Sequence, residues 1–84
     1  MKIYTYNVFG SELQVYVSAK WAKVYLNGAL CDWTMDLDNT KLQIATPNAG
    51  KAIIYVNLAY DATKQTCNVV VQKAAEPLIP VCVE

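Results

Sequence analysis

Hydrophobic and polar residues alternate along most of this chain, which is the pattern of β-strands that bury one face. Two such segments, 2–8 and 13–18, open the sequence, and a turn at 9–12 separates them. Because successive side chains of a strand point to opposite faces, each segment has one apolar side. The apolar sides consist of Tyr4, Tyr6 and Val8 in the first segment and Leu13, Val15 and Val17 in the second. Both segments are therefore predicted to be strands.

The dipeptide Asn27-Gly28 predicts a hairpin between two apolar-rich runs. A two-residue type I′ turn needs positive φ at both central positions, and Asn-Gly adopts it readily. Directly opposed residues then share one side of the ribbon. One side collects Ala22, Val24, Leu26, Ala29, Cys31 and Trp33, and the other collects Trp21, Lys23, Tyr25, Leu30, Asp32 and Thr34. The first set is entirely apolar, so Trp33 is expected in the core, and Lys23 is expected to face Asp32.

The rest of the chain continues as short strands between turn signals. The second hairpin strand is expected to run to about residue 37, and further strands are expected at 42–46, 52–58 and 67–72, separated by turns at 38–40, 47–50 and 61–65. No long window has a helical period, and turn signals recur about every 8–12 residues, as in sandwiches and barrels. The sequence therefore predicts an all-β fold: a single small antiparallel β-sandwich or barrel, immunoglobulin-like, of about seven strands.

The C-terminal segment 76–84 differs from the rest because it contains Pro77 and Pro80. Proline cannot donate a ladder hydrogen bond, so such a segment forms at most an edge strand or an arm. We therefore expect one β domain over residues 1–75 and a proline-containing C-terminal arm or edge strand over residues 76–84.

Composition adds the expectation of self-association. Hydrophobic residues make up 55% of the 84 residues and charged residues only 17%, whereas a domain of this size has a small core. The apolar surplus is expected on a sheet face or in an interface, and small β proteins often cover their edges by association. A homo-oligomer is therefore expected.

The charged residues argue against several classes of function. Seven lysines balance seven acidic residues, and the chain contains neither Arg nor His. Without positive net charge or the bidentate Arg fork, nucleic-acid binding is not expected. Without His, neither an enzyme nor a metal or cofactor site is expected. No apolar run approaches about 18 residues and the first ten residues lack an apolar signal core, so neither a membrane span nor a signal peptide is predicted.

Three cysteines stand at positions 31, 67 and 82 without a CxxC spacing. Cys31 lies on the apolar side of the predicted hairpin, and Cys67 alternates with Val69 and Val71. Both are therefore expected to be small buried hydrophobes. A Cys31–Cys67 disulfide and an intermolecular link through Cys82 are the alternatives.

Asp32, Asp36 and Asp38 are expected to share one face of the second hairpin strand. Paired carboxylates can act as acid and base or bind Ca²⁺, but no glycine stands where a calcium loop needs one. A solvated strand face is therefore the expected role of these residues.

Four aromatic residues are candidates for a binding surface. Trp21 and Tyr25 lie on the outer side of the predicted hairpin, whereas Tyr16 and Tyr55 alternate with polar residues in other strands. Amphipathic aromatics among amides and hydroxyls suit protein interfaces and sugar stacking alike, and a second sheet covering this face is the other alternative. The expected contact surface comprises Tyr16, Trp21, Tyr25 and Tyr55, together with Leu78, Ile79 and Val81 of the arm.

The order of features between Val24 and Val56 has a counterpart in a known family. A strand leads into the Asn-Gly turn, and four further elements follow: WTMD at 33–36, LQI at 42–44, PNAG at 47–50 and IIYV at 53–56. This order resembles the small β-modules of tailed-phage virion proteins, especially near tail-fibre N-termini, with the pattern V-x-V-N-G … I-x-F … P-x-x-G-x-x-I-x-V. The similarity covers about 33 of 84 residues. The chain departs from the pattern at Ala45-Thr46, where an aromatic usually precedes the proline.

The resemblance implies an attachment, spacer or decoration module that oligomerises and has no active site. We therefore expect a non-enzymatic virion structural protein of a phage, either a capsid decoration or cement subunit or a small tail component. It would be made in the host cytoplasm, reside in the virion, and contact other virion proteins or itself. The alternatives are a small soluble phage-encoded inhibitor that binds a host protein complex in the host cytoplasm, and a carbohydrate-binding β module.

Overall fold

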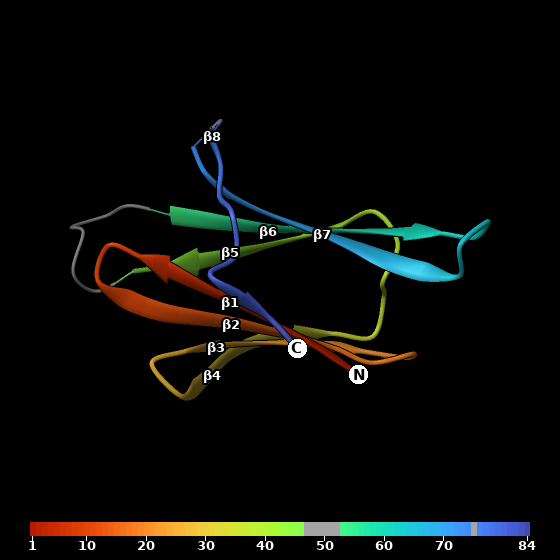
Figure 1. Ribbon diagram of the computed structural model, residues 1–84, viewed down its shortest axis with the longest axis horizontal. Coiled ribbons are helices and arrows are strands. Elements are labelled where there is room, and N and C mark those ends of the chain that lie inside the picture. Colours follow the sequence, from red (N-terminus) through yellow and green to blue (C-terminus); the bar gives the residue numbers. More distant parts are fainter. Residues whose placement is uncertain (47–52, 75) are drawn as a thin grey trace.

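The computed structural model describes residues 1–46, 53–74 and 76–84 as two antiparallel β-sheets packed face to face (Figure 1). The strands are β1 (Lys2–Val8), β2 (Ser11–Val17), β3 (Ala22–Leu26), β4 (Ala29–Thr34), β5 (Thr40–Ala45), β6 (Ile53–Asp61), β7 (Thr66–Lys73), β8 (Glu76–Pro77) and β9 (Cys82–Val83). The predicted small antiparallel β-sandwich is confirmed. Its seven longer strands are β1 to β7, and the C-terminal segment adds the two short ones.

Strand order follows the sequence almost throughout. The first sheet has the order β4-β3-β2-β1-β9 and the second β5-β6-β7-β8, so each is built from consecutive hairpins. The chain passes from one sheet to the other after β4 and returns after β8 (Figure 1). The likeness to an immunoglobulin domain is therefore one of architecture, because two meanders replace the Greek-key connections of that fold.

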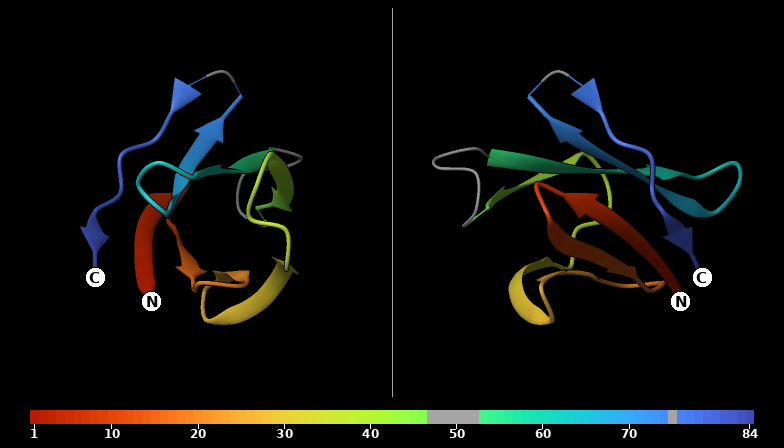
Figure 2. Two further views of the ribbon diagram at one scale, coloured as in Figure 1. Left: turned by 90° about the vertical axis from the view of Figure 1, so that its right-hand side faces the viewer. Right: turned by 60° about the vertical axis from the view of Figure 1, so that its left-hand side comes forward.

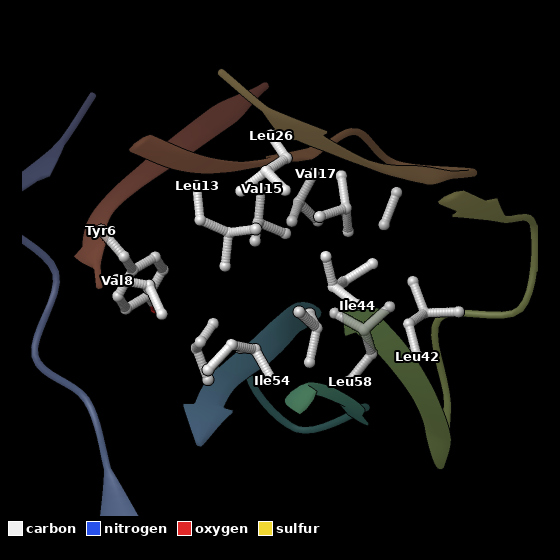
Figure 3. Packing of buried hydrophobic residues seen from close by; sticks show 14 residues of the cluster. Tyr6, Val8, Leu13, Val15, Val17, Leu26, Leu42, Ile44, Ile54 and Leu58 are labelled. Atoms are coloured by element: carbon white, nitrogen blue, oxygen red, sulfur yellow. The ribbon is translucent and has the colours of Figure 1, made fainter. Parts of the chain in front are cut away.

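The core fills the space between the two sheets with the alternating apolar residues of their facing sides (Figure 3). From the first sheet come Tyr6, Val8, Leu13, Val15, Val17, Ala22, Val24 and Leu26, and from the second come Leu42, Ile44, Ile54, Val56, Leu58 and Val71. The inner sides predicted for the first two strands are confirmed. The strongly apolar strand β6 lies between β5 and β7.

Two tight turns close the same end of the first sheet. Asn27 and Gly28 have φ of 50° and 83°, as the predicted type I′ turn requires, and Phe9 and Gly10 repeat this pattern at 52° and 79°. The Asn27 side chain joins the turns, because its Oδ1 accepts a hydrogen bond from the Glu12 amide at 3.0 Å. The first turn is shorter than the sequence predicts, since strand pairing resumes at residue 11.

The register predicted for the Asn-Gly hairpin is correct beside the turn and wrong beyond it. Tyr25 faces Leu30 as predicted, but Val24 faces Asp32, because one extra residue in β4, Cys31, forms a β-bulge. This shift turns Trp33 to the outer side, opposite Lys23. The prediction that Cys31 and Trp33 lie on the inner side is therefore wrong. Ala29 keeps its predicted place opposite Leu26, and all three residues are exposed.

The position of β4 explains this correction. It is the edge strand of its sheet, and its inner side lies at the margin of the core, since Ala29 is exposed and Asp32 is only half-buried. At the margin of the core, the inner side of an edge strand is only partly covered and can carry a polar residue. A bulge with an inward-pointing acid also discourages pairing of this edge with another chain. The strand also ends at Thr34 rather than near residue 37.

The second sheet agrees with the sequence where it is described. The strand expected at 42–46 is β5, in which Leu42 and Ile44 are buried, and Thr46 directly after it is buried too. The loop expected at 61–65 follows the long strand β6. The turn predicted at 47–50 lies outside the described residues.

Candidate interaction surface

The outer side of the first sheet carries a continuous set of large apolar side chains. The strand registers align Ile3, Tyr16, Lys23 and Trp33 in one row across four strands, and Thr5, Gln14, Tyr25 and Leu30 in the next. Trp21 precedes β3 and lies beside the first row. We call the set Ile3, Tyr16, Trp21, Tyr25, Leu30 and Trp33 the aromatic face.

Contacts within the aromatic face hold its rings in place. The Tyr16 and Tyr25 rings lie 4.9 Å apart, centroid to centroid, at a tilt of 59°. Lys23 Nζ stands 4.7 Å from the Trp21 ring centroid, a cation–π contact. This lysine was expected to pair with Asp32, and the bulge separates the two residues along the ladder.

The bend before β3 positions Trp21. Ser18 Oγ accepts hydrogen bonds from the amides of Trp21 at 3.1 Å and Lys20 at 3.2 Å. The Ser18 amide in turn donates to the Trp21 carbonyl at 2.9 Å. Trp21 is thereby fixed by its backbone at the start of the strand, and its ring is half-buried.

Sequence reasoning missed the most exposed members of this face. Trp33 is 54% exposed and Leu30 51% exposed, and both lie on the edge strand β4. The predicted hairpin puts Leu30 on the correct side, but nothing in the pattern marks it as a contact residue. The alternation puts Trp33 in the core, because a single-residue bulge leaves no trace in an alternating pattern.

Tyr55 lies on the opposite side of the molecule. It belongs to the outer side of the second sheet, between Gln43 and Gln72 in the strand register, and Lys41 Nζ stands 4.6 Å from its ring centroid. Beside it, Asn57 Nδ2 donates to Gln72 Oε1 at 2.5 Å. The expected surface that joins Tyr55 to Tyr16, Trp21 and Tyr25 is therefore divided by the core, and Tyr55 stands among amides.

The three residues expected from the arm have different environments. Leu78 is half-buried and packs against the core, whereas Ile79 is 87% exposed and Val81 68% exposed. They belong to a segment that runs from the edge of the second sheet to the edge of the first (Figure 2). Ile79 and Val81 are thus available for contact, and Leu78 anchors the segment.

The cysteines are all reduced. Cys31 and Cys82 are exposed and Cys67 is half-buried, so the alternative of a Cys31–Cys67 disulfide is not realised. Cys67 packs against the core as expected, and burial raises the pKa of its thiol, which also lies 3.5 Å from the Leu37 carbonyl oxygen. The expectation that Cys31 is buried is wrong, because it is the bulged residue.

The three aspartates do not share a strand face, because β4 ends before two of them. Asp36 Oδ1 accepts a hydrogen bond from the Asp38 amide at 3.0 Å, and Asp38 Oδ1 accepts one from the Tyr60 amide at 3.2 Å. They organise the crossover between the sheets. Within residues 1–46, 53–74 and 76–84, no group of three potential ligands is placed to hold a metal ion.

A cleft of about 370 Å³ opens at one end of the sandwich. Tyr4 and Val17 of the first sheet and Tyr60 and Cys67 of the second contribute to its walls, with Leu37 from the crossover. Its lining is mainly apolar, and the half-buried Cys67 thiol lies there with a raised pKa, which lowers its nucleophilicity near neutral pH.

Comparison with known proteins adds no relative: neither a protein-family model nor a curated protein nor a solved structure matches this chain. In the described part of the chain no helix is long and apolar enough to span a membrane. The fold defines the class as a small antiparallel β-sandwich, and the aromatic face is its main candidate site.

Proposed function

We propose that this chain is a non-enzymatic virion structural protein of a phage-like virus, a capsid decoration subunit or a small tail component, and that its aromatic face docks on a neighbouring virion protein. The observation that carries the proposal is the exposure of Trp33 and Leu30 on the outer face of the first sheet, beside three further aromatic rings. Buried aromatic anchors supply much of the binding energy in protein interfaces, and charged residues are depleted at interface centres.

The contrast between the two outer faces supports this choice of surface. On the second sheet, the exposed apolar residues Ile53 and Val70 are separated by the row that contains Gln43, Tyr55 and Gln72. On the first sheet Ile3 faces Tyr16, whose ring is in contact with that of Tyr25, and Tyr25 faces Leu30. Lys23 lies between Tyr16 and Trp33 in the register, and its Nζ stands over the Trp21 ring. A contiguous exposed apolar patch marks an interaction site more often than scattered residues do.

The setting in a virion rests on the resemblance of residues 24–56 to the β-modules of tailed-phage virion proteins. That resemblance implies a small β-module, and the chain is an all-β sandwich. Such modules work through surfaces rather than reactive groups. The absence of Arg and His from the sequence also favours contact over chemistry.

Quantitative mass spectrometry of purified virus particles from the source tests whether this chain is a component of the virion. A copy number close to that of the major capsid protein is expected for a decoration subunit, and a few copies per particle for a tail component. If the chain is missing from particles, the proposal fails, and an intracellular inhibitor of a host protein complex takes its place.

Substitution of the two most exposed side chains of the aromatic face tests whether this face is the docking surface. Leu30→Ser combined with Trp33→Ser should lower the copy number in particles at least tenfold, because interface anchors contribute about 1.4 kcal/mol or more. Ile53→Ser combined with Val70→Ser is the matched control on the opposite face and should leave the copy number unchanged.

Both variants should keep cooperative thermal unfolding, since all four side chains are well exposed. Equal losses from the two double variants would show that the aromatic face is not the docking surface. Retention of a glycan on an array by the wild type, abolished by Trp21→Ala with the fold intact, would replace the proposal with a carbohydrate-binding module.

A further inference from the structure

The C-terminal segment 76–84 bridges the two sheets through backbone hydrogen bonds (Figure 2). At its start, the Leu78 amide donates to the Val71 carbonyl at 2.8 Å, next to the β7–β8 pairing. At its end, Ile3 and Glu84 exchange two amide–carbonyl bonds of 2.8 Å each. Tyr4 faces Val83 between these ends. The segment therefore pairs with the free edges of both meanders.

Side chains contribute little to this attachment. Ile79 is 87% exposed, Val81 68% and Val83 50%, and only Leu78 among the large apolar residues of the segment packs against the core. The attachment to β1 is thus made mainly by the main chain. An identical segment from a second copy would form the same bonds with the same β1 edge.

The backbone at Ala74, which precedes the segment, is conformationally unfavourable. Ala74 has φ of 55°, a left-handed conformation that residues with a Cβ adopt rarely. Further along, Pro77 and Pro80 fix φ and lack an amide proton, so the segment stays extended. A strained turn followed by an extended, weakly buried strand is the arrangement that favours exchange between copies.

We propose that residues 76–84 are exchanged reciprocally between two copies of this chain, so that β9 of each copy pairs with β1 of the other and β8 with β7 of the other. In the monomer, or closed form, each segment pairs with its own copy. In the exchanged dimer every one of these hydrogen bonds is formed again between the copies, and the turn at Ala74 opens. Nine extended residues span about 30 Å, which exceeds the two shorter dimensions of the molecule, 24 Å and 21 Å. The segment is therefore long enough to lie across a neighbouring copy.

This exchange is independent of the proposed function. It concerns the β1 edge and a second copy of the same chain, whereas the proposed function concerns the aromatic face and another virion protein. The test uses purified protein alone, so either proposal can fail without the other.

Cross-linking between two single-cysteine chains tests the exchange. Thr5 lies directly opposite Cys82, and Cα atoms of opposed residues in antiparallel strands are about 4.5–5.5 Å apart, which is within disulfide range. One chain carries Thr5→Cys and Cys82→Ala, the other keeps Cys82, and both carry Cys31→Ala and Cys67→Ala. In this pair a disulfide between positions 5 and 82 can form only between different copies.

The two chains are unfolded together, refolded at increasing concentration and oxidised. We expect the mixed disulfide dimer to exceed either homodimer at least fivefold and to increase with concentration. A mixed dimer no more abundant than the homodimers, while Thr5→Cys with Cys82 in one chain forms an intramolecular disulfide, would overturn the proposal.

Substitutions at Ala74 supply a second test in the same cross-linking assay. Glycine adopts positive φ at little cost, so Ala74→Gly should favour the closed monomer, whereas Ala74→Val should favour exchange. The expected order of mixed dimer is Val, then Ala, then Gly, with steps of about fivefold. Ala74 is exposed, so neither change alters the core. The reverse order, or no change across the three residues, would contradict exchange through this turn.

Discussion

Asn27 does more for the first sheet than form its own turn. Its amide donates to the Glu12 carbonyl at 2.8 Å, and its side chain accepts from the Glu12 amide and donates to Ser11 Oγ at 3.4 Å. The β3–β4 turn is thereby attached to the start of β2, and one residue joins two hairpins. The orientation of the Asn27 side chain depends on the left-handed backbone of the turn. Substitution of individual turn residues should therefore change the free energy of unfolding measurably.

Gly28→Val is expected to lower the free energy of unfolding by more than about 1 kcal/mol, because a β-branched residue is forced to positive φ. A Cβ at this position would meet no atom within 4 Å, so the cost comes from the backbone alone. Urea denaturation measures it. Ala29→Val, at the next exposed position, is the control and should be nearly neutral; matching curves for the two variants would argue against the type I′ turn.

Tyr6 should make the domain sensitive to alkali. Its side chain is buried, and desolvation, with a smaller contribution from Tyr4, raises the pKa of its hydroxyl above the ordinary 10.0. The unfolded chain therefore loses this proton at lower pH than the folded one, so the free energy of unfolding falls as pH rises above about 10. Melting temperatures measured across this range should fall less steeply for Tyr6→Phe than for the wild type. If melting temperature falls equally with pH in both proteins, Tyr6 does not contribute to the loss of stability in alkali.

At the scale of elements, alternation predicts which side of a strand is buried but not a local interruption of the alternation. It correctly gives the inner sides of β1, β2 and β3, because each of these strands packs over the second sheet. It fails in β4, where one bulged residue reverses the sides from Asp32 onward. The apolar residues of an edge strand look like core residues in the sequence, and only the extent of the facing sheet decides whether they are covered.

Trp33→Ala distinguishes the observed register from the one that the sequence predicts. A core tryptophan would cost about 3–5 kcal/mol when truncated, whereas a side chain that is 54% exposed should cost less than about 1 kcal/mol. Leu13→Ala, at a fully buried position, is the positive control and should cost about 2–5 kcal/mol. Chemical denaturation of the three proteins decides the matter, and a Trp33→Ala loss as large as that of Leu13→Ala would restore the predicted register.

At the scale of the whole molecule, the sandwich and its seven longer strands could be predicted, but the composition of the candidate site only in part. Tyr16, Trp21 and Tyr25 are brought together because they lie on neighbouring strands of one hairpin series. Tyr55 is separated from them because β6 belongs to the other sheet, and no local pattern states which sheet a strand joins. The aromatic face is thus a product of topology as well as of sequence.

The pairing of Ile3 with Glu84 has a mechanical consequence. The two ends of the chain lie side by side at the same end of the β1–β9 ladder (Figure 1). A force that pulls the two ends apart therefore acts on the hydrogen bonds of this ladder one after another rather than on all of them at once. Such a ladder unzips under a small load. The C-terminal strand would peel away first and lengthen the tether between the ends, and the two meanders would stay intact behind it.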